Sequence, residues 1–192
     1  PITLTMPATM SLERRKLLKA LGANLVLTEG PLGMKGAIAK ANEILESEPG
    51  KYVLLQQFEN PANPEIHEQT TGPEIWDATD GEVDVFVAGV GTSGTIMGTG
   101  RRLKEHRRPD GGGVTVVAIE PDDAFHGLEG LKHMESSIVP AIFRPDEAVD
   151  QMLFMPTDEA WEVTERLARD EGLHVGHSAG ANVAGALRLA RQ

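Results

Sequence analysis

Short apolar segments alternate with helix-like segments along most of this chain. The segments expected to be strands are residues 1–5, 25–27, 52–55, 83–88, 114–119, 152–155 and 173–175. Between two of them, Met34, Ile38 and Ala41 recur with the spacing of one helix face. Alternation of this kind predicts an α/β fold in which helices cover parallel sheets.

Capping residues and glycines predict where several helices begin and end. Ser11 is placed to cap a helix that Gly22 ends, and Thr157 to cap a helix that Gly172 ends. Further helices are expected over residues 34–45, 65–76, 95–106 and 181–191. Residues 125–137 match no regular pattern and are expected to be irregular.

Composition narrows the class of protein. Hydrophobic residues make up 40% of the 192 residues, which is enough for a globular core. The chain has no cysteine, so disulfides, thiolate metal sites and a cysteine nucleophile are excluded. No apolar run approaches the roughly 20 residues that span a bilayer, and residues 1–5 do not resemble a signal peptide. We therefore expect a cytoplasmic protein without a membrane partner.

The charge balance argues against a nucleic-acid partner. The formal net charge is −11, whereas neutralising phosphates requires a basic face. The one local exception is a run of cations: Arg101, Arg102, Lys104, Arg107 and Arg108. We interpret this run as the solvated C-terminal end of a helix, where cations complement the helix dipole, rather than as a binding patch.

The strongest chemical signal is the segment Gly89–Thr95, with the sequence GVGTSGT, between a predicted strand and a predicted helix. Glycines allow a tight turn and a close approach of the backbone to a ligand. The first N–H groups of a helix point toward an anion, and Thr92, Ser93 and Thr95 add hydroxyl donors. A ligand-free turn does not require so many small and polar residues, so we predict a phosphate-binding loop.

The residues alone leave the identity of the phosphate open. Gly89, Gly91 and Gly94 fit the pattern G-x-G-x-x-G, and Glu120 ends the next strand, 26 positions after Gly94 (120 − 94). That pattern is typical of dinucleotide binding, so the NAD-binding half of a dehydrogenase is one alternative. The three hydroxyls favour a single, enclosed phosphate group, as in a mononucleotide or another cofactor.

A second glycine loop, Gly176–Gly180, precedes the last predicted helix. Ligands of open α/β sheets bind at the carboxyl ends of strands, where both loops are expected to lie. Ser178 is either a helix cap or a ligand contact. His174 and His177 have a spacing seen in metal sites, but without further ligands nearby we predict no metal.

Longer motifs in the chain resemble those of cysteine synthases (O-acetylserine sulfhydrylases) and the related cystathionine β-synthases. The matching segments are Thr5–Arg15, Gly22–Thr28, Gln57–Pro64, Thr70–Trp76, Gly91–Thr95 and Gly176–Gly180. The resemblance covers nearly the whole chain and implies pyridoxal 5'-phosphate (PLP) as the cofactor. It implies the fold-type II (tryptophan synthase β-like) architecture of three-layer, parallel-sheet α/β domains, incomplete here, and a homodimer in the full-length form.

The same resemblance implies a reaction and the residues that support it. The reaction is β-replacement, which forms L-cysteine from an activated serine, such as O-acetylserine, and sulfide. Ser178 would meet the pyridine nitrogen, and Gln57 would lie near the substrate carboxylate. The residues that would hold the phosphate are Gly91, Thr92, Ser93, Gly94 and Thr95.

By this resemblance the chain is a piece of a longer enzyme. Residues 1–58 would be the remaining part of a smaller, mobile domain, and residues 59–192 a truncated domain that binds the PLP phosphate. The family's Schiff-base lysine falls before Pro1, and the seven lysines present are expected to be solvated, so we expect an inactive fragment. Residues 125–134 depart from the family's usual glycine-rich stretch, which leaves the substrate open. A non-catalytic, truncated binding module is the remaining alternative.

Overall fold

The computed structural model describes residues 1–191, which divide into two compact units. The first unit is Pro1–Leu55, and the second begins at Gln56. The sequence places the boundary after residue 58, and the roles of the two domains stay predictions.

The first unit is a two-stranded parallel sheet with helices. Its elements are β1 (Thr3–Pro7), α1 (Leu12–Ala20), β2 (Asn24–Thr28), the 3-10 turn η1 (Gly30–Leu32) and α2 (Gly33–Ser47). The Ser11 side chain accepts a hydrogen bond from the N–H of Arg14, and Gly22 follows α1 with φ 86°, so both predicted ends of this helix are confirmed. Met6 of β1 and Ala37 of α2 are the buried hydrophobic residues of this unit.

Two predicted strands do not form. Residues 52–56 have no regular structure, and Val53 is 87% exposed, because no strand of the described chain pairs with this segment. Residues 173–175 connect the helix that ends at Asp170 with the helix that begins at His177. The N–H of Leu173 donates to the carbonyl of Leu167 and closes the preceding helix end instead of joining a sheet. Apolar composition alone therefore gave the wrong prediction at both places.

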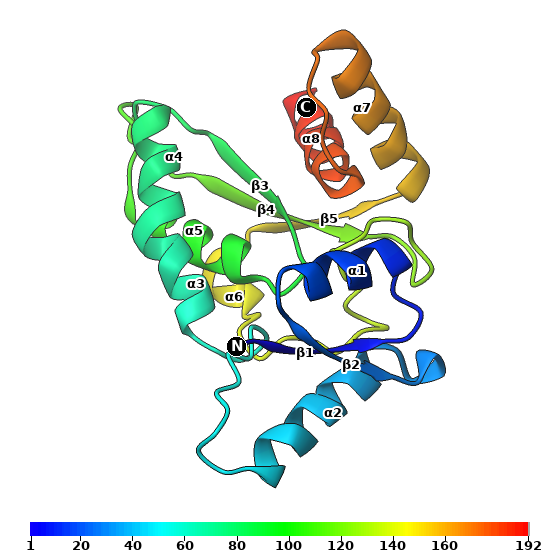
Figure 1. The fold of residues 1–192 in the computed structure, drawn as a ribbon. Coiled ribbons are helices and arrows are strands. Elements are labelled where there is room, and N and C mark those ends of the chain that lie inside the picture. The colour runs from blue at the N-terminus through cyan, green and yellow to red at the C-terminus, as the bar shows by residue number, and fades with distance from the viewer. Residues whose placement is uncertain (192) are drawn as a thin grey trace. The chain divides into compact units, whose positions relative to one another are not determined.

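The second unit carries a three-stranded parallel sheet in the order β3-β4-β5 (Figure 1). Its elements are α3 (Ala62–Ile66), the π-helical turn η2 (His67–Thr71), α4 (Gly72–Ala78), β3 (Val85–Gly89), α5 (Gly94–Glu105), β4 (Thr115–Pro121), α6 (Pro145–Ala148), β5 (Gln151–Met155), α7 (Thr157–Asp170) and α8 (His177–Ala190). Residues 125–137 are irregular apart from turns, as predicted.

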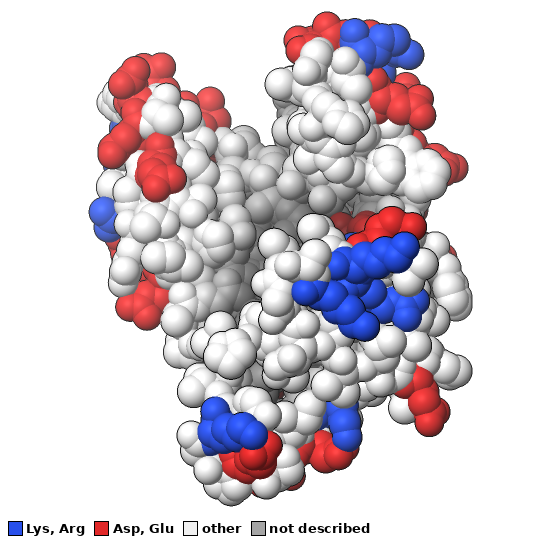
Figure 2. All heavy atoms as spheres, in the orientation of Figure 1, with Lys and Arg blue, Asp and Glu red and all other residues white. Residues whose placement is uncertain are grey.

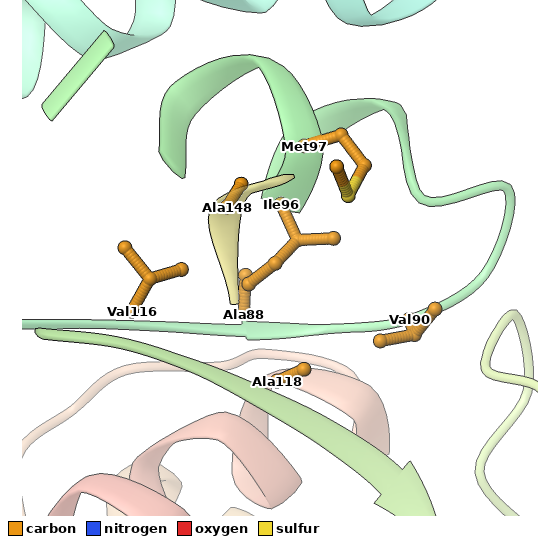
Figure 3. Close-up of a cluster of buried hydrophobic side chains, with 7 residues drawn as sticks. All are labelled: Ala88, Val90, Ile96, Met97, Val116, Ala118 and Ala148. Atoms are coloured by element: carbon orange, nitrogen blue, oxygen red, sulfur yellow. The ribbon is translucent and has the colours of Figure 1, made fainter. Parts of the chain in front are cut away.

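Alternate residues of β4 serve two separate hydrophobic clusters. Val116 and Ala118 pack with Ile96 and Met97 of α5 (Figure 3). Ile119, whose side chain points to the other face, packs with buried residues of α7 and α8. Helices therefore cover both faces of this sheet, and the predicted three-layer α/β arrangement is confirmed for this unit.

Two helix starts differ from the sequence-based expectation. Pro156, not Thr157, is the N-cap of α7, and the hydroxyl of Thr157 accepts a hydrogen bond from the N–H of Gly127 at 3.0 Å instead. Helix α8 begins at His177 rather than at residue 181, because the extended backbone of Gly176 provides its N-cap. The predictions failed because Thr157 bonds to a residue distant in sequence and because Gly176 starts α8 earlier than expected.

The basic run of α5 is largely neutralised by acidic partners. Arg101 pairs with Glu147 and Lys104 with Asp150. Arg102 pairs with Glu105, and Arg108 pairs with both Asp84 and Asp110. On the face drawn in Figure 2, basic side chains gather instead over α1. Within residues 1–191, no helix has the length and apolar character needed to cross a bilayer.

Candidate functional site

The loop after β3 is shaped by the sheet before it and by the helix after it. The N–H of Val90 donates to the carbonyl of Ile119, so pairing with β4 continues one residue beyond β3. Ser93 then adopts a left-handed conformation with φ 74° and is only 3% exposed. Left-handed backbone is unusual for a residue with a side chain and is found at functional sites more often than elsewhere. Helix α5 begins immediately afterwards, at Gly94.

This loop leaves a row of backbone donors free. Among the described residues, the N–H groups of residues 92–96 have no protein acceptor. Ser93 does not cap the helix, because its hydroxyl donates to the carbonyl of Thr92. Free N–H groups and the positive end of a 12-residue helix together form a site for an anion. A phosphate group, such as that of PLP, fits this set of donors.

Two glycines keep the walls of the loop close. A Cβ atom on Gly91 would overlap the backbone carbonyl of Gly130, and one on Gly94 would overlap the side-chain amide of Asn63. Residues 125–134 and helix α3 therefore stand directly against the loop. The predicted requirement for glycine at both positions has a steric cause in the fold.

Polar side chains from the helical stretch opposite the loop contact its hydroxyl groups. The Asn63 amide nitrogen donates to Thr92 Oγ1 at 3.2 Å, and Nε2 of His67 lies 3.2 Å from Thr95 Oγ1. The other imidazole nitrogen of His67, Nδ1, lies 2.9 Å from Thr71 Oγ1. The sequence analysis missed all three helical residues. Their spacing of four, at positions 63, 67 and 71, is the signal of one helix face that could have identified them.

Asn63 also connects the loop with Gln57. Its amide nitrogen donates to the backbone carbonyl of Gln57 at 2.8 Å, besides the bond to Thr92. The Gln57 side chain is exposed. The structure thus brings the predicted substrate-binding residue and the predicted phosphate loop together through one side chain.

Backbone N–H groups of the divergent segment 125–134 form hydrogen bonds at the C-terminal end of each strand of the three-stranded sheet. The N–H of Lys132 donates to the carbonyl of Val90 after β3, at 2.8 Å. The N–H of Met134 donates to the Glu120 carboxylate of β4, at 2.5 Å, and the bond from Gly127 to Thr157 follows β5. This segment is therefore part of the site, although it has no regular structure.

Glu120 is consequently unavailable for the role that the dinucleotide alternative assigned to it. Its side chain is 5% exposed, and the carboxylate accepts the backbone hydrogen bond from Met134. A carboxylate that binds ribose must reach the ligand with its oxygens. The structure argues against the NAD-binding interpretation at this position.

Lys132 departs from the expectation that all lysines are solvated, because it is half-buried. Its ammonium group lies 5.1 Å from the centre of the Phe58 ring, within the range of a cation–π interaction. Burial lowers the pKa of Lys132 below its usual range. Burial also lowers the pKa of the neighbouring His126, and the charge of His133 adds to that effect.

In the second glycine loop, the side chain of Ser178 has no hydrogen-bond partner in the described chain. Ser178 lies in the first turn of α8, two residues after the cap residue Gly176, and its side chain is half-buried. The interpretation of Ser178 as a helix cap is therefore wrong. Farther along α8, the buried Oδ1 of Asn182 also lacks a partner among residues 1–191. No hydrogen bond within this part of the chain links Ser178 to Gln57 or to the phosphate loop.

His177 stacks on Trp161 with ring centres 4.8 Å apart. In the part of the chain that the structure describes, no group of three histidine or carboxylate side chains is placed to hold a metal ion. In that part of the chain, His174 and His177 therefore have no third ligand with which to hold a metal ion.

The comparison with known families decides which phosphate compound is relevant. A family described as "Pyridoxal-phosphate dependent enzyme" matches residues 1–192. The chain belongs to this family. The predicted cofactor, PLP, is confirmed at the level of the family, and the alternative of a dehydrogenase finds no support.

Individual relatives agree with this placement. The chain is 51% identical to cysteine synthase A of Escherichia coli over 198 residues, which cover 98% of the chain and 61% of that protein. The crystal structure of cysteine synthase from Entamoeba histolytica matches with a TM-score of 0.89 and 37% identity, over 99% of the chain and 56% of that protein. The O-acetylserine-dependent cystathionine β-synthase of Helicobacter pylori matches with a TM-score of 0.84 and 34% identity, over 98% and 61%.

The fold-type II architecture is confirmed by these structures. The chain spans about three fifths of the length of the curated relatives that it matches.

Proposed function

We propose that the full-length protein catalyses the PLP-dependent formation of L-cysteine from an activated serine, O-acetylserine or a similar ester, and sulfide. The observation that carries this proposal is the row of free N–H groups at residues 92–96, enclosed by the close contacts of Gly91 and Gly94. The names of the relatives supply the reaction. Their substrates are small molecules, and so are those proposed here.

Different residues of this chain would bind the phosphate, the pyridine ring and the substrate. The N–H groups of residues 92–96 and the hydroxyls of Thr92 and Thr95 would hold the phosphate dianion. Ser178, whose hydroxyl is not otherwise engaged, would meet the pyridine nitrogen. Gln57 would bind the substrate carboxylate through its exposed amide. PLP, when bound, supplies the electron sink for the reaction.

The choice of a serine hydroxyl at the pyridine nitrogen has a chemical consequence. A hydroxyl is too weak an acid to keep this nitrogen protonated, whereas a carboxylate would stabilise the protonated form. Ser178 therefore favours a neutral ring, which withdraws electrons less strongly. This favours a reaction in which the leaving group of the substrate takes the electron pair, as β-replacement requires.

We further propose a cytoplasmic homodimer that binds neither nucleic acid nor membranes. Phe125 is 99% exposed, and an aromatic side chain of this kind is typical of a protein–protein contact. The net charge of −11 and the ion pairs of the basic run oppose nucleic-acid binding. Light scattering of the full-length protein, and a shift to monomer in Phe125→Glu, would test the dimer.

The test of the activity uses the full-length protein with O-acetylserine, sulfide and PLP, and measures L-cysteine. We expect turnover that is lost when PLP is removed and returns when PLP is added back. Residues 1–192 alone are expected to bind PLP without turnover. Retention of NAD but not of PLP on dialysis would contradict the proposal, and so would PLP retention by a Gly91→Val, Thr95→Ala variant equal to that of the unaltered protein.

A further inference from the structure

The helical stretch opposite the phosphate loop contains one turn of π-helix at His67–Thr71. Its defining bond runs from the N–H of Gly72 to the carbonyl of His67, five residues earlier. Single π-helical turns inside α-helices are rare and occur frequently at functional sites. Here the turn begins at the histidine whose ring contacts the phosphate loop.

The backbone of His67 is fixed against α5 by two glycines. A Cβ atom on Gly98 of α5 would overlap the carbonyl of Pro64 and would lie 2.9 Å from Cβ of His67. A Cβ atom on Gly72 would lie 2.7 Å from Cβ of Arg102. Because α5 also carries the phosphate loop at its start, His67 and Thr95 are held on one rigid pair of helices.

If Thr95 binds phosphate, the hydrogen bonds of a neutral imidazole ring at His67 determine its tautomer. A hydroxyl has one proton, so a Thr95 hydroxyl that donates to a phosphate dianion must accept from His67. Nε2 of His67, 3.2 Å away, then carries the proton. Nδ1 becomes the acceptor for the Thr71 hydroxyl at 2.9 Å. The result is a directed chain of donors from Thr71 through His67 and Thr95 to the phosphate.

We infer that His67 is a positioning residue for the cofactor phosphate, which it orients through the hydroxyl of Thr95. The inference rests on the proposed function only in taking the ligand of the loop to be a phosphate. His67 does not touch the phosphate itself. Its role is to hold the Thr95 hydroxyl with its proton directed at the ligand, and Thr71 fixes the tautomer that allows this.

Two amide substitutions separate the two ring nitrogens. In His67→Gln the amide nitrogen can take the place of Nε2 and donate to Thr95, whereas in His67→Asn it reaches only the place of Nδ1. We expect His67→Asn to weaken PLP binding about fivefold and His67→Gln less than twofold, since one neutral hydrogen bond is lost only in the former. Equilibrium dialysis measures the PLP affinity, and the ³¹P chemical shift of bound PLP is expected to move in His67→Asn alone.

A double-mutant cycle with Thr95→Ala identifies the path of the effect. In the Thr95→Ala background, His67→Asn is expected to cause no further loss of PLP affinity. An equal loss in both amide variants, or an undiminished loss in the Thr95→Ala background, would overturn the inference. If His67→Asn does not fold, Thr71→Val replaces it, and an unchanged affinity for PLP in that variant would overturn the inference too.

The same measurements distinguish this inference from the proposed function. If Thr95→Ala leaves the affinities for PLP and for inorganic phosphate unchanged, the phosphate site itself is wrong. If Thr95→Ala weakens both but the His67 variants do not couple to it, only the role of His67 is wrong. Neither measurement depends on the formation of cysteine.

Discussion

The two glycine loops of the second unit resemble each other in sequence but differ in what they offer a ligand. The loop after β3 leaves the N–H groups of residues 92–96 free. In the loop before α8, the carbonyl of Gly176 accepts from the N–H groups of Ala179 and Gly180. In the described chain the first loop therefore leaves five consecutive N–H groups free, whereas the second uses two of its N–H groups within the helix start and adds the Ser178 hydroxyl.

The surroundings of the glycines differ in the same way. A Cβ atom on Gly91 would overlap the carbonyl of Gly130, whereas one on Gly176 would have no atom within 4 Å. Glycine thus has distinct causes in these loops. Gly91 allows close packing at the proposed anion site, Gly176 caps a helix in open space, and Gly180 lets α8 approach the carbonyl of Ala160 in α7.

The largest expected effect comes from adding one methyl group to the first loop, with the same change in the second loop as the control. Gly91→Ala should lower PLP affinity on the order of 100-fold, about 2.7 kcal/mol, because the backbone of Gly130 must move and the free N–H groups lose their alignment. Gly176→Ala is the matched control and should change the affinity less than twofold. Equilibrium dialysis with PLP gives both values. Similar losses in the two variants would mean that the loops do not differ as described.

A smaller effect is expected at the second loop, and on the reaction rather than on affinity. In the full-length protein, Ser178→Asp should slow cysteine formation roughly tenfold and shift the absorption spectrum of bound PLP, because a carboxylate stabilises the protonated pyridine nitrogen. Retention of PLP should change little, since the proposed phosphate site is the other loop. Ser178→Ala is the control without charge. An unchanged rate and spectrum would leave Ser178 without a role at the ring.

The smallest effect concerns the scaffold under the first loop. Burial alone would raise the pKa of Asp150, but hydrogen bonds from Lys104 and from the N–H of Val116, together with the Lys104 charge, lower it overall. A carboxylate with a lowered pKa stabilises the folded state above its ordinary pKa, near 3.8, and loses this contribution as pH falls through the lowered value. Thermal melting between about pH 5 and pH 2 measures the loss.

Asp150→Asn should flatten this part of the stability profile by less than about 1 kcal/mol, because the ion pair with Lys104 is 41% exposed on the carboxylate side. Glu147→Gln in α6, whose carboxylate pairs with Arg101 of the same helix α5, is a comparison in which no backbone N–H is involved. A profile that stays as steep in Asp150→Asn as in the unaltered protein would show that other groups dominate acid unfolding.

The sequence was sufficient to predict the strand, glycine turn and helix start around residues 89–95, because that signal is local. A strand, closely spaced glycines and a helix start within a few residues determine where the N–H groups point. The partners of that loop were not predicted, because Asn63 and His67 act across the packing of two helices. The asparagines and prolines of Asn60–Pro64 favour a turn by composition, which hides the polar helix face that continues through Thr71. Helix packing, not local pattern, makes those residues part of the site.

The two wrong strands have a related cause. Residues 52–55 and 173–175 have the apolar character of strands, but a strand requires a neighbour with a free edge. The segment before α8 is short, and Leu173 closes the end of α7 instead. Local composition shows which segments are able to form a strand, and the topology of the sheet decides which of them pair.

The three backbone hydrogen bonds that fasten residues 125–134 have a consequence for how such a protein diversifies. The donors are the N–H groups of Gly127, Lys132 and Met134, which any amino acid except proline would provide. The exposed side chains between these points can therefore vary while the sheet beneath keeps its shape, whereas Leu128, which is fully buried, and Gly130, with φ 93°, are constrained. Relatives that keep these three bonds and these two residues can differ in the rest of the segment without a change of fold.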